Sequence, residues 1–208
     1  MKRILKMLVA VLCLSALLLS ATSCSASPLS SYKEDTEDGK STYYVAMAIE
    51  GYGVIIVQLD SEAAPKTVEN FVKLVREDFY DGLTFHRVME NFMIQGGDPK
   101  GDGTGGSKDK IPGEFSLNGW YNPISHERGV ISMARSSAYD SASSQFFICN
   151  ANSYFLDGQY AAFGRVVEGM DVVDAITANT AVFGDSNGVI AREKYRAVIT
   201  EMKVIVYE

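Results

Sequence analysis

Short segments of alternating apolar and polar residues, separated by turns, recur along most of this 208-residue chain. Val45, Met47 and Ile49 alternate with smaller or polar residues, and the turn at 51–53 leads into a second apolar-rich run at 54–59. Period-two alternation is typical of half-buried strands, and a glycine-bearing turn between two such runs predicts a β-hairpin. Because no helix recurs regularly between the strand segments, they predict an antiparallel sheet.

Further strand candidates follow this hairpin, and two helical segments interrupt them. The first helix is predicted from Pro65, which can occupy a first helical turn, and has apolar residues at helical spacing: Val68, Phe71, Val72 and Val75. The second is predicted near 169–178. The remaining strand candidates are 84–89, 92–96, 129–134, 145–150, 161–167 and 197–207. We therefore predict a mainly β domain whose sheet closes or folds on itself, with two helices covering its openings.

The first 23 residues predict an export signal. A basic start, MKRILK, overlaps an apolar segment at 4–19 that is too short to predict a spanning helix. Small residues at 21–23 then lead directly to Cys24, which resembles the site where bacterial lipoproteins are cleaved and acylated. We expect a signal peptide at 1–23, a lipid on Cys24 and an extracytoplasmic, membrane-anchored protein. The alternative is an ordinary secretory signal followed by an incidental cysteine.

Residues 25–42 are polar and charged, a composition that predicts a flexible tether between Cys24 and a domain at 43–208. Cys149 would be the one cysteine left in that domain. It lies in the apolar run FFIC, so we predict a buried, inert thiol and no disulfide.

The charge of the chain disfavours nucleic acid as a partner. The formal net charge is −7, and loss of residues 1–23 would remove three basic residues and no acidic one, which gives −10. An acidic surface repels phosphate backbones, and no basic patch with interleaved aromatic residues is present in the sequence.

The glycine-rich segment GGDPKGDGTGG does not predict a nucleotide site. Gly101, Gly103 and Gly106 satisfy the pattern G-x-G-x-x-G, but that pattern binds a dinucleotide only where a helix begins within it. A proline and a glycine at 112–113 stand where this helix should run. No Gly-Lys-Ser/Thr phosphate loop occurs either, so we expect no nucleotide cofactor.

Metal and hydrolase sites are equally poorly supported. His86 and His126 are the only histidines, and no cysteine cluster accompanies them. Ser143 and Ser144 lack the strained elbow on which a serine hydrolase places its nucleophile. We therefore expect no metal and no cofactor of any kind.

Arg87 is unusual because it lies within the mostly apolar run TFHRVM. A guanidinium removed from water requires an anion, a carbonyl or a ligand. If this run and the next form a hairpin, Met93 and Gln95 share one face of the second strand, beside Arg87. This arrangement favours a hydrogen-bond donor held ready for a ligand. The alternative is a surface ion pair of Arg87 with Glu90 or Asp98.

Seven spaced blocks of the sequence resemble the cyclophilin family of peptidyl-prolyl cis-trans isomerases. They are FHRV at 85–88, FMIQGGD at 92–98, GTGG at 103–106, GVISMAR at 129–135, SQFFI at 144–148, LDG at 156–158 and FG at 163–164. The resemblance runs from residue 43 to the C-terminus. It implies a closed eight-stranded antiparallel barrel capped by two α-helices, and an enzyme that accelerates isomerisation of X–Pro bonds in exported proteins.

The resemblance also implies roles for individual residues. Arg87 would be the catalytic residue and Gln95 would support it. The substrate would contact His86, Phe92, Met93, Ala134, Gln145, Phe147, Phe155, Leu156 and Tyr160. Phe155 and Tyr160 stand where the best-known eukaryotic members have tryptophan and histidine. Because phenylalanine lacks the indole N–H, we expect at most weak binding of cyclosporin.

Two other functions remain open from the sequence. The same groove would also suit a non-catalytic module or holdase chaperone that binds proline-containing polypeptides. The second possibility is a structural role, in a secreted β-domain unrelated to this family. The expected partners are proline-containing polypeptides, and the membrane would be contacted through the lipid anchor only.

Overall fold

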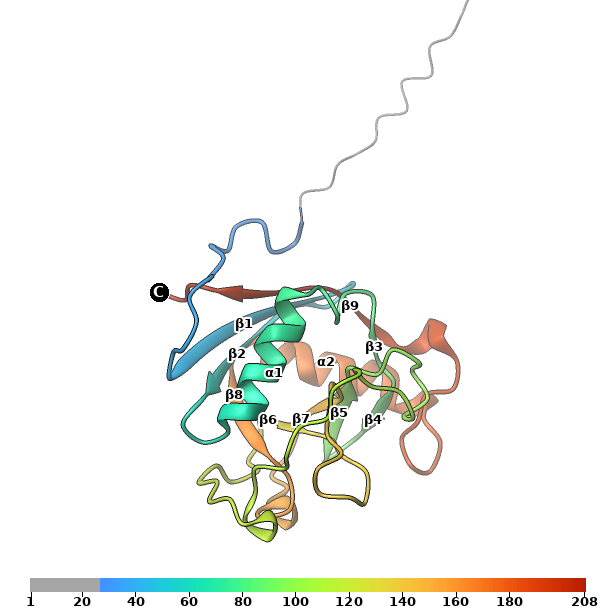
Figure 1. The fold of residues 1–208 in the computed structure, drawn as a ribbon. Coiled ribbons are helices and arrows are strands. Elements are labelled where there is room, and N and C mark those ends of the chain that lie inside the picture. Colours follow the sequence, from blue (N-terminus) through green and yellow to red (C-terminus); the bar gives the residue numbers. More distant parts are fainter. Residues whose placement is uncertain (1–26) are drawn as a thin grey trace, which may run out of the picture.

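The computed structural model describes residues 27–208, so the predicted signal peptide and Cys24 lie outside the described residues (Figure 1). The strands are β1 (Thr42–Ile49), β2 (Gly53–Asp60), β3 (Thr84–Phe85), β4 (Arg87–Met89), β5 (Met93–Gly96), β6 (Val130–Met133), β7 (Phe146–Cys149), β8 (Ala162–Glu168) and β9 (Ala197–Ile205). The two α-helices are α1 (Pro65–Arg76) and α2 (Met170–Thr180). Within residues 27–208, no helix has the length and apolar character needed to cross a membrane.

The strands form one antiparallel sheet that is nearly closed into a barrel. Their order is β3-β9-β1-β2-β8-β6-β7-β5-β4. The two end strands, β3 and β4, are consecutive in the chain and are joined by His86 alone, so the chain itself closes the sheet. The expectation of eight strands is corrected to nine, because the segment 84–89 divides at His86: β3 pairs with β9, whereas β4 pairs with β5.

The predicted hairpin is present, with β1 and β2 paired over their full length from Thr42↔Asp60 to Ile49↔Gly53. The side chains that face the inside of the barrel form the main core together with the apolar faces of both helices. Phe71 of α1 lies at the centre of this core, with ring centroids 5.1 Å from Tyr80, 5.1 Å from Phe163 and 5.4 Å from Phe146. The sequence prediction of a mainly β domain with two helices is confirmed.

α1 begins at Pro65, as predicted, but its first turn is capped by a distant residue. Ala64, at the N-cap, has no side chain that could accept a hydrogen bond. The buried Glu114 carboxylate takes that role: it accepts hydrogen bonds from the backbone N–H of Lys66 at 2.9 Å and of Thr67 at 2.8 Å. The backbone donors that every helix leaves free in its first turn are therefore satisfied by tertiary structure.

Residues 27–41, here called the N-terminal strap, pack on the domain, although their composition predicts a tether. Leu29 is fully buried in a small cluster with Ala46, Ala48 and Ile205 on the outer face of the sheet. The strap also follows the free edge of β9: Asp35 N donates to Val204 O at 2.9 Å. An unpaired strand edge offers free backbone groups, and the strap satisfies part of that edge.

Candidate functional site

The β4–β5 hairpin determines where Arg87 lies. Arg87 pairs with Gln95 and Met89 pairs with Met93 across the two strands, as the predicted hairpin requires. The turn between them contains Asn91 with a φ of 57°, a left-handed conformation that asparagine tolerates better than most residues. The register places the side chains of Arg87, Gln95, Met89 and Met93 on one face of the hairpin.

Three neutral groups hold the Arg87 guanidinium. Nε donates to the backbone carbonyl of Asn187 at 2.7 Å, and Nη1 donates to Gln95 Oε1 at 3.1 Å. Nη2 lies 3.1 Å from the sulfur of Met89. A guanidinium has five N–H groups, so two remain free to donate to a ligand.

The alternative of an ion pair is wrong for Arg87. Within the described part of the chain, no carboxylate lies within 4.0 Å of the Arg87 nitrogen atoms, and this holds for Glu90 and Asp98 as well. The buried Asp98 carboxylate instead accepts backbone N–H groups of the glycine-rich loop, among them Gly103 N at 2.6 Å. Partial burial lowers the pKa of Arg87, and the nearby Tyr160 and Asp185 side chains oppose this shift. Arginine nevertheless stays cationic in proteins.

Arg87 lies at one side of a pocket of about 290 Å³. The apolar part of the pocket is built on a cluster of Met93, Phe147, Cys149 and Leu156. The lining residues are His86, Arg87, Phe92, Met93, Gln95, Gly103, Ala134, Arg135, Phe147, Leu156, Tyr160 and Val189. A pocket of this kind, with an apolar floor and one cationic donor at its side, suits a small apolar ring attached to a polar chain.

Most of the site residues predicted from the sequence meet in this pocket, and two of them lie beside it. Gln145 contributes indirectly, because its amide is 2.9 Å from that of Gln95, which in turn binds Arg87. Phe155 is 65% exposed and lies at the rim, where its ring centroid is 5.4 Å from that of Phe92 and the two ring planes are inclined by 42°.

Besides Met89, whose sulfur helps to hold the guanidinium, four contributors were not predicted from the sequence. Gly103 and Arg135 line the pocket and belong to sequence blocks that were recognised, so inspection of those blocks could have included them. Val189 and the Asn187 carbonyl come from a loop about 100 residues further along the chain. Nothing in the sequence near Arg87 indicates that this loop is its neighbour.

A buried histidine supports the pocket from behind. The His126 ring is nearly parallel to that of Phe147, with centroids 6.1 Å apart and planes inclined by 17°. Its Nδ1 lies 2.8 Å from the Asp157 carboxylate and its Nε2 lies 3.0 Å from the Ser132 hydroxyl. Asp157 directly follows Leu156, so His126 connects two walls of the pocket. Burial lowers the pKa of His126 despite the neighbouring Asp157, and this favours the neutral ring.

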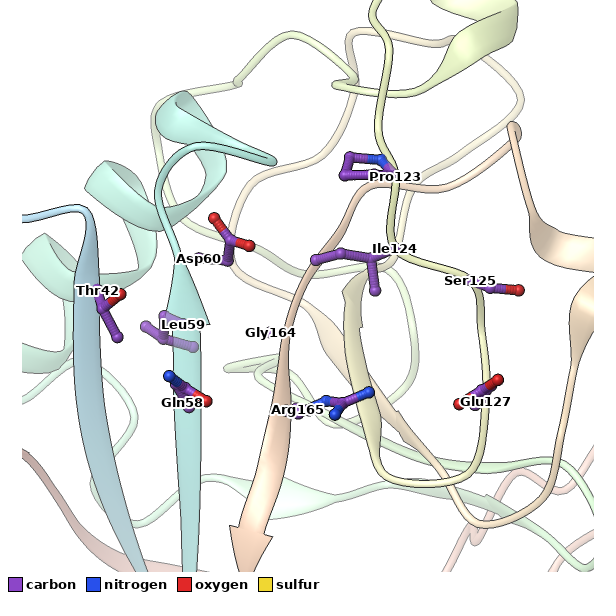
Figure 2. Close-up of a pocket in the computed structure, with 10 residues that line it drawn as sticks. All are labelled: Thr42, Gln58, Leu59, Asp60, Pro123, Ile124, Ser125, Glu127, Gly164 and Arg165. Carbon is purple, nitrogen blue, oxygen red and sulfur yellow. The ribbon is translucent and has the colours of Figure 1, made fainter.

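A second, larger groove of about 500 Å³ lies between β2, β8 and the loop at 123–127 (Figure 2). Asp60, Glu127 and Arg165 give this groove a mixed charge. It shares no lining residue with the pocket beside Arg87 and has no aromatic wall. The smaller pocket is therefore the better candidate site for an apolar ring.

Neither a metal cluster nor a reactive thiol accompanies the pocket. Within residues 27–208, no three histidine, cysteine, aspartate or glutamate side chains lie close enough to hold a metal ion. Cys149 is buried, as predicted, and burial raises the pKa of its thiol to about 12. At that pKa the thiol is not a nucleophile near neutral pH.

Comparison with known proteins by a family model and by sequence identifies similar proteins of one kind. The family model described as "Cyclophilin type peptidyl-prolyl cis-trans isomerase/CLD" matches residues 44–204. A peptidyl-prolyl cis-trans isomerase of Helicobacter pylori is 40% identical over 151 residues, 72% of this chain and 89% of that protein. Peptidyl-prolyl cis-trans isomerase A of Dickeya dadantii is 47% identical over 130 residues, which is 60% of this chain and 66% of the relative.

A similar fold has been solved by crystallography. The Cryptosporidium parvum cyclophilin type peptidyl-prolyl cis-trans isomerase, crystallised in the presence of the dipeptide Ala-Pro, aligns with a TM-score of 0.68 and 26% sequence identity. The alignment covers 79% of this chain and 99% of the other.

Proposed function

Because this chain belongs to the cyclophilin-type peptidyl-prolyl cis-trans isomerase family, we propose that it accelerates X–Pro isomerisation by donating a hydrogen bond from Arg87 to the prolyl nitrogen. The observation that carries this proposal is the environment of the Arg87 guanidinium. It is held by neutral partners, is free of carboxylates and lies beside an apolar pocket. The proline ring would occupy the pocket between Phe92, Met93, Phe147 and Leu156.

The reaction requires neither a nucleophile nor a base. Resonance gives the amide C–N bond partial double-bond character, and the barrier to its rotation is about 18–20 kcal/mol. Isomerisation of X–Pro bonds without a catalyst therefore takes roughly tens to hundreds of seconds. An enzyme accelerates it if it weakens this resonance in the transition state.

Arg87 suits that task because of what happens to the prolyl nitrogen. When the amide is twisted, the nitrogen regains a lone pair and can accept a hydrogen bond that the planar amide cannot accept. A fixed donor at this position binds the transition state more tightly than the substrate, which is the condition for catalysis. The planar guanidinium is a rigid donor and keeps its charge at any working pH.

The direct test is Arg87→Ala, assayed on a proline-containing tetrapeptide. We expect kcat/KM to fall by about 10²–10³-fold, the loss typical of removing one transition-state donor. Arg87→Lys should recover little, because a lysine cannot reproduce the planar fork or the Nε–H bond to Asn187. Arg165→Ala removes an arginine from the groove of Figure 2 and is the matched control, which should keep full activity.

Unchanged turnover in Arg87→Ala would falsify the catalytic role. The same variant separates isomerisation from the alternative function as a holdase. If it suppresses aggregation of a refolding client as well as the wild-type protein does, the groove binds polypeptides independently of catalysis.

We also propose that the substrates are exported proteins. The basic start, the apolar segment at 4–19 and the small residues before Cys24 support this proposal. Cell fractionation tests it: recovery of the wild-type protein in the cytoplasm would contradict an extracytoplasmic role.

A further inference from the structure

A turn near the C-terminus is closed by one carboxylate. In the 184–190 loop, Asp185 Oδ1 accepts hydrogen bonds from the backbone N–H of Asn187 at 2.8 Å and of Val189 at 3.0 Å. The backbone of Asp185 adds two more, because its carbonyl accepts from Gly188 N and its N–H donates to Val189 O. The Asp185 side chain therefore fixes the direction of the peptide groups at 187–189.

This loop is attached to the strand that carries Arg87. Val88 N donates to Gly188 O at 2.9 Å, and Ile190 N donates to His86 O at 2.9 Å. Gly188 allows the close approach: its φ is +79°, and a Cβ atom there would lie 2.7 Å from Val88 O. The loop thus runs along the outer edge of β4, and the Asn187 carbonyl faces Arg87.

The Asn187 carbonyl is the shortest of the three contacts that hold the guanidinium. It accepts from Nε, the nitrogen through which the guanidinium joins the rest of the side chain. A bond at Nε fixes the plane of the fork, whereas Gln95 and Met89 restrain its two ends. The direction of the two free N–H groups consequently depends on the Asn187 carbonyl, and catalytic geometry tolerates only small errors in such directions.

We propose that Asp185 is a positioning residue for Arg87. Its carboxylate closes the turn that presents the Asn187 carbonyl to Nε, and it thereby orients the guanidinium toward the pocket. This inference rests on the proposed catalytic role of Arg87 and extends it to a residue that touches neither the substrate nor the reacting bond.

The experiment compares two variants of Asp185 in the steady-state assay on a proline tetrapeptide. Asp185→Ala removes the acceptor, and we expect kcat to fall by about five- to twentyfold with little change in KM. Asp185→Asn keeps an oxygen acceptor for both N–H groups but removes the charge, and it should retain most of the activity. If Asp185→Asn were as impaired as Asp185→Ala, the charge and not the turn would matter, and the proposal would be overturned.

Asp60 offers a matched control for the loss of such a turn. Its Oδ1 accepts from the backbone N–H of Glu62 at 2.9 Å and of Ala63 at 3.0 Å, a closely similar arrangement in the β2–α1 connection. Asp60 lines the other groove. Asp60→Ala should lower stability without lowering kcat, and an equal loss of kcat in this variant would show that the effect of Asp185→Ala is not specific to Arg87.

A double-mutant cycle separates this proposal from the one on which it rests. If Asp185 acts through Arg87, then Asp185→Ala should have no further effect in an Arg87→Ala background. An active Arg87→Ala protein overturns the proposed function and this inference together. An inactive Arg87→Ala protein with a fully active Asp185→Ala protein overturns only the positioning role, as does a loss of the same size in both backgrounds. Because Asp185 is exposed, the variants are expected to fold, and their circular dichroism and urea unfolding verify this.

Discussion

Arg87 is cationic, and its charge is available to a ligand because all three groups that hold the guanidinium are neutral. A carboxylate in place of the Asn187 carbonyl or the Gln95 amide would bind the guanidinium more tightly, but it would also compete for the charge that the proposed mechanism requires. The histidine behind the pocket wall differs from Arg87, because one of its partners is the Asp157 carboxylate. His126 is buried behind Phe147, where a charged ring would be costly.

The two histidines predict how stability depends on pH. Burial lowers the pKa of both His86 and His126 from the ordinary value of 6.5. The folded protein therefore binds fewer protons than the unfolded chain just below pH 6.5, and the free energy of unfolding falls as the pH decreases through that range. Urea unfolding at pH 8 and at pH 5.5 should show lower stability at pH 5.5.

A single substitution checks the source of this pH dependence. His126→Gln removes one of the two titrating groups, so the difference in stability between the two pH values should become smaller. A wild-type protein that is equally stable at pH 8 and pH 5.5, or a His126→Gln variant with an undiminished difference, would contradict this account.

At the scale of elements, the β4–β5 hairpin and α1 depend on different kinds of information. The hairpin register follows from local alternation and a turn that asparagine can adopt, so Arg87 and Gln95 come together without help from distant residues. The first turn of α1 instead takes its cap from Glu114, 47 residues later in the chain. The conformation around Glu114 and the stability of the helix are consequently coupled.

Substitution of Glu114 should therefore destabilise the whole domain. In Glu114→Ala the backbone N–H groups of Lys66 and Thr67 lose their acceptor, and we expect the free energy of unfolding to fall by about 1–3 kcal/mol. Glu114→Gln keeps one acceptor oxygen and should lie between the wild type and Glu114→Ala. Urea denaturation measures all three. A Glu114→Ala protein as stable as the wild type would show that solvent replaces the cap without loss.

At the scale of the whole molecule, the N-terminal strap changes how the chain would be attached to a membrane. A flexible tether at 25–42 would allow the barrel to move over tens of ångströms. Because the strap packs on the sheet from Leu29 onward, the covalent chain from Cys24 to Leu29 can span only about 17 Å. We propose that a lipid on Cys24 would hold the barrel close to the membrane surface.

The anchor is tested by Cys24→Ala. We expect this variant to leave the membrane fraction, because alanine has no sulfur to which a lipid can be attached. Its activity on a tetrapeptide should stay unchanged. Fractionation followed by the isomerase assay measures both. Retention in the membrane fraction of a Cys24→Ala chain that has lost residues 1–23 would rule out lipidation of this residue as the anchor.

Local sequence patterns were enough to predict the mainly β class, the helix that starts at Pro65, the hairpin register that pairs Arg87 with Gln95, and most of the pocket residues. Each of these depends on a local pattern or on a block that can be read within a few residues. Other features arise from contacts that form when the chain folds: the break at His86 that gives nine strands, the cap of α1 by Glu114, and the packing of Leu29. The contact between the Asn187 carbonyl and Arg87 is of the same kind. These features join residues tens to more than a hundred positions apart, and their energies come from burial and from satisfied backbone groups that no local pattern records.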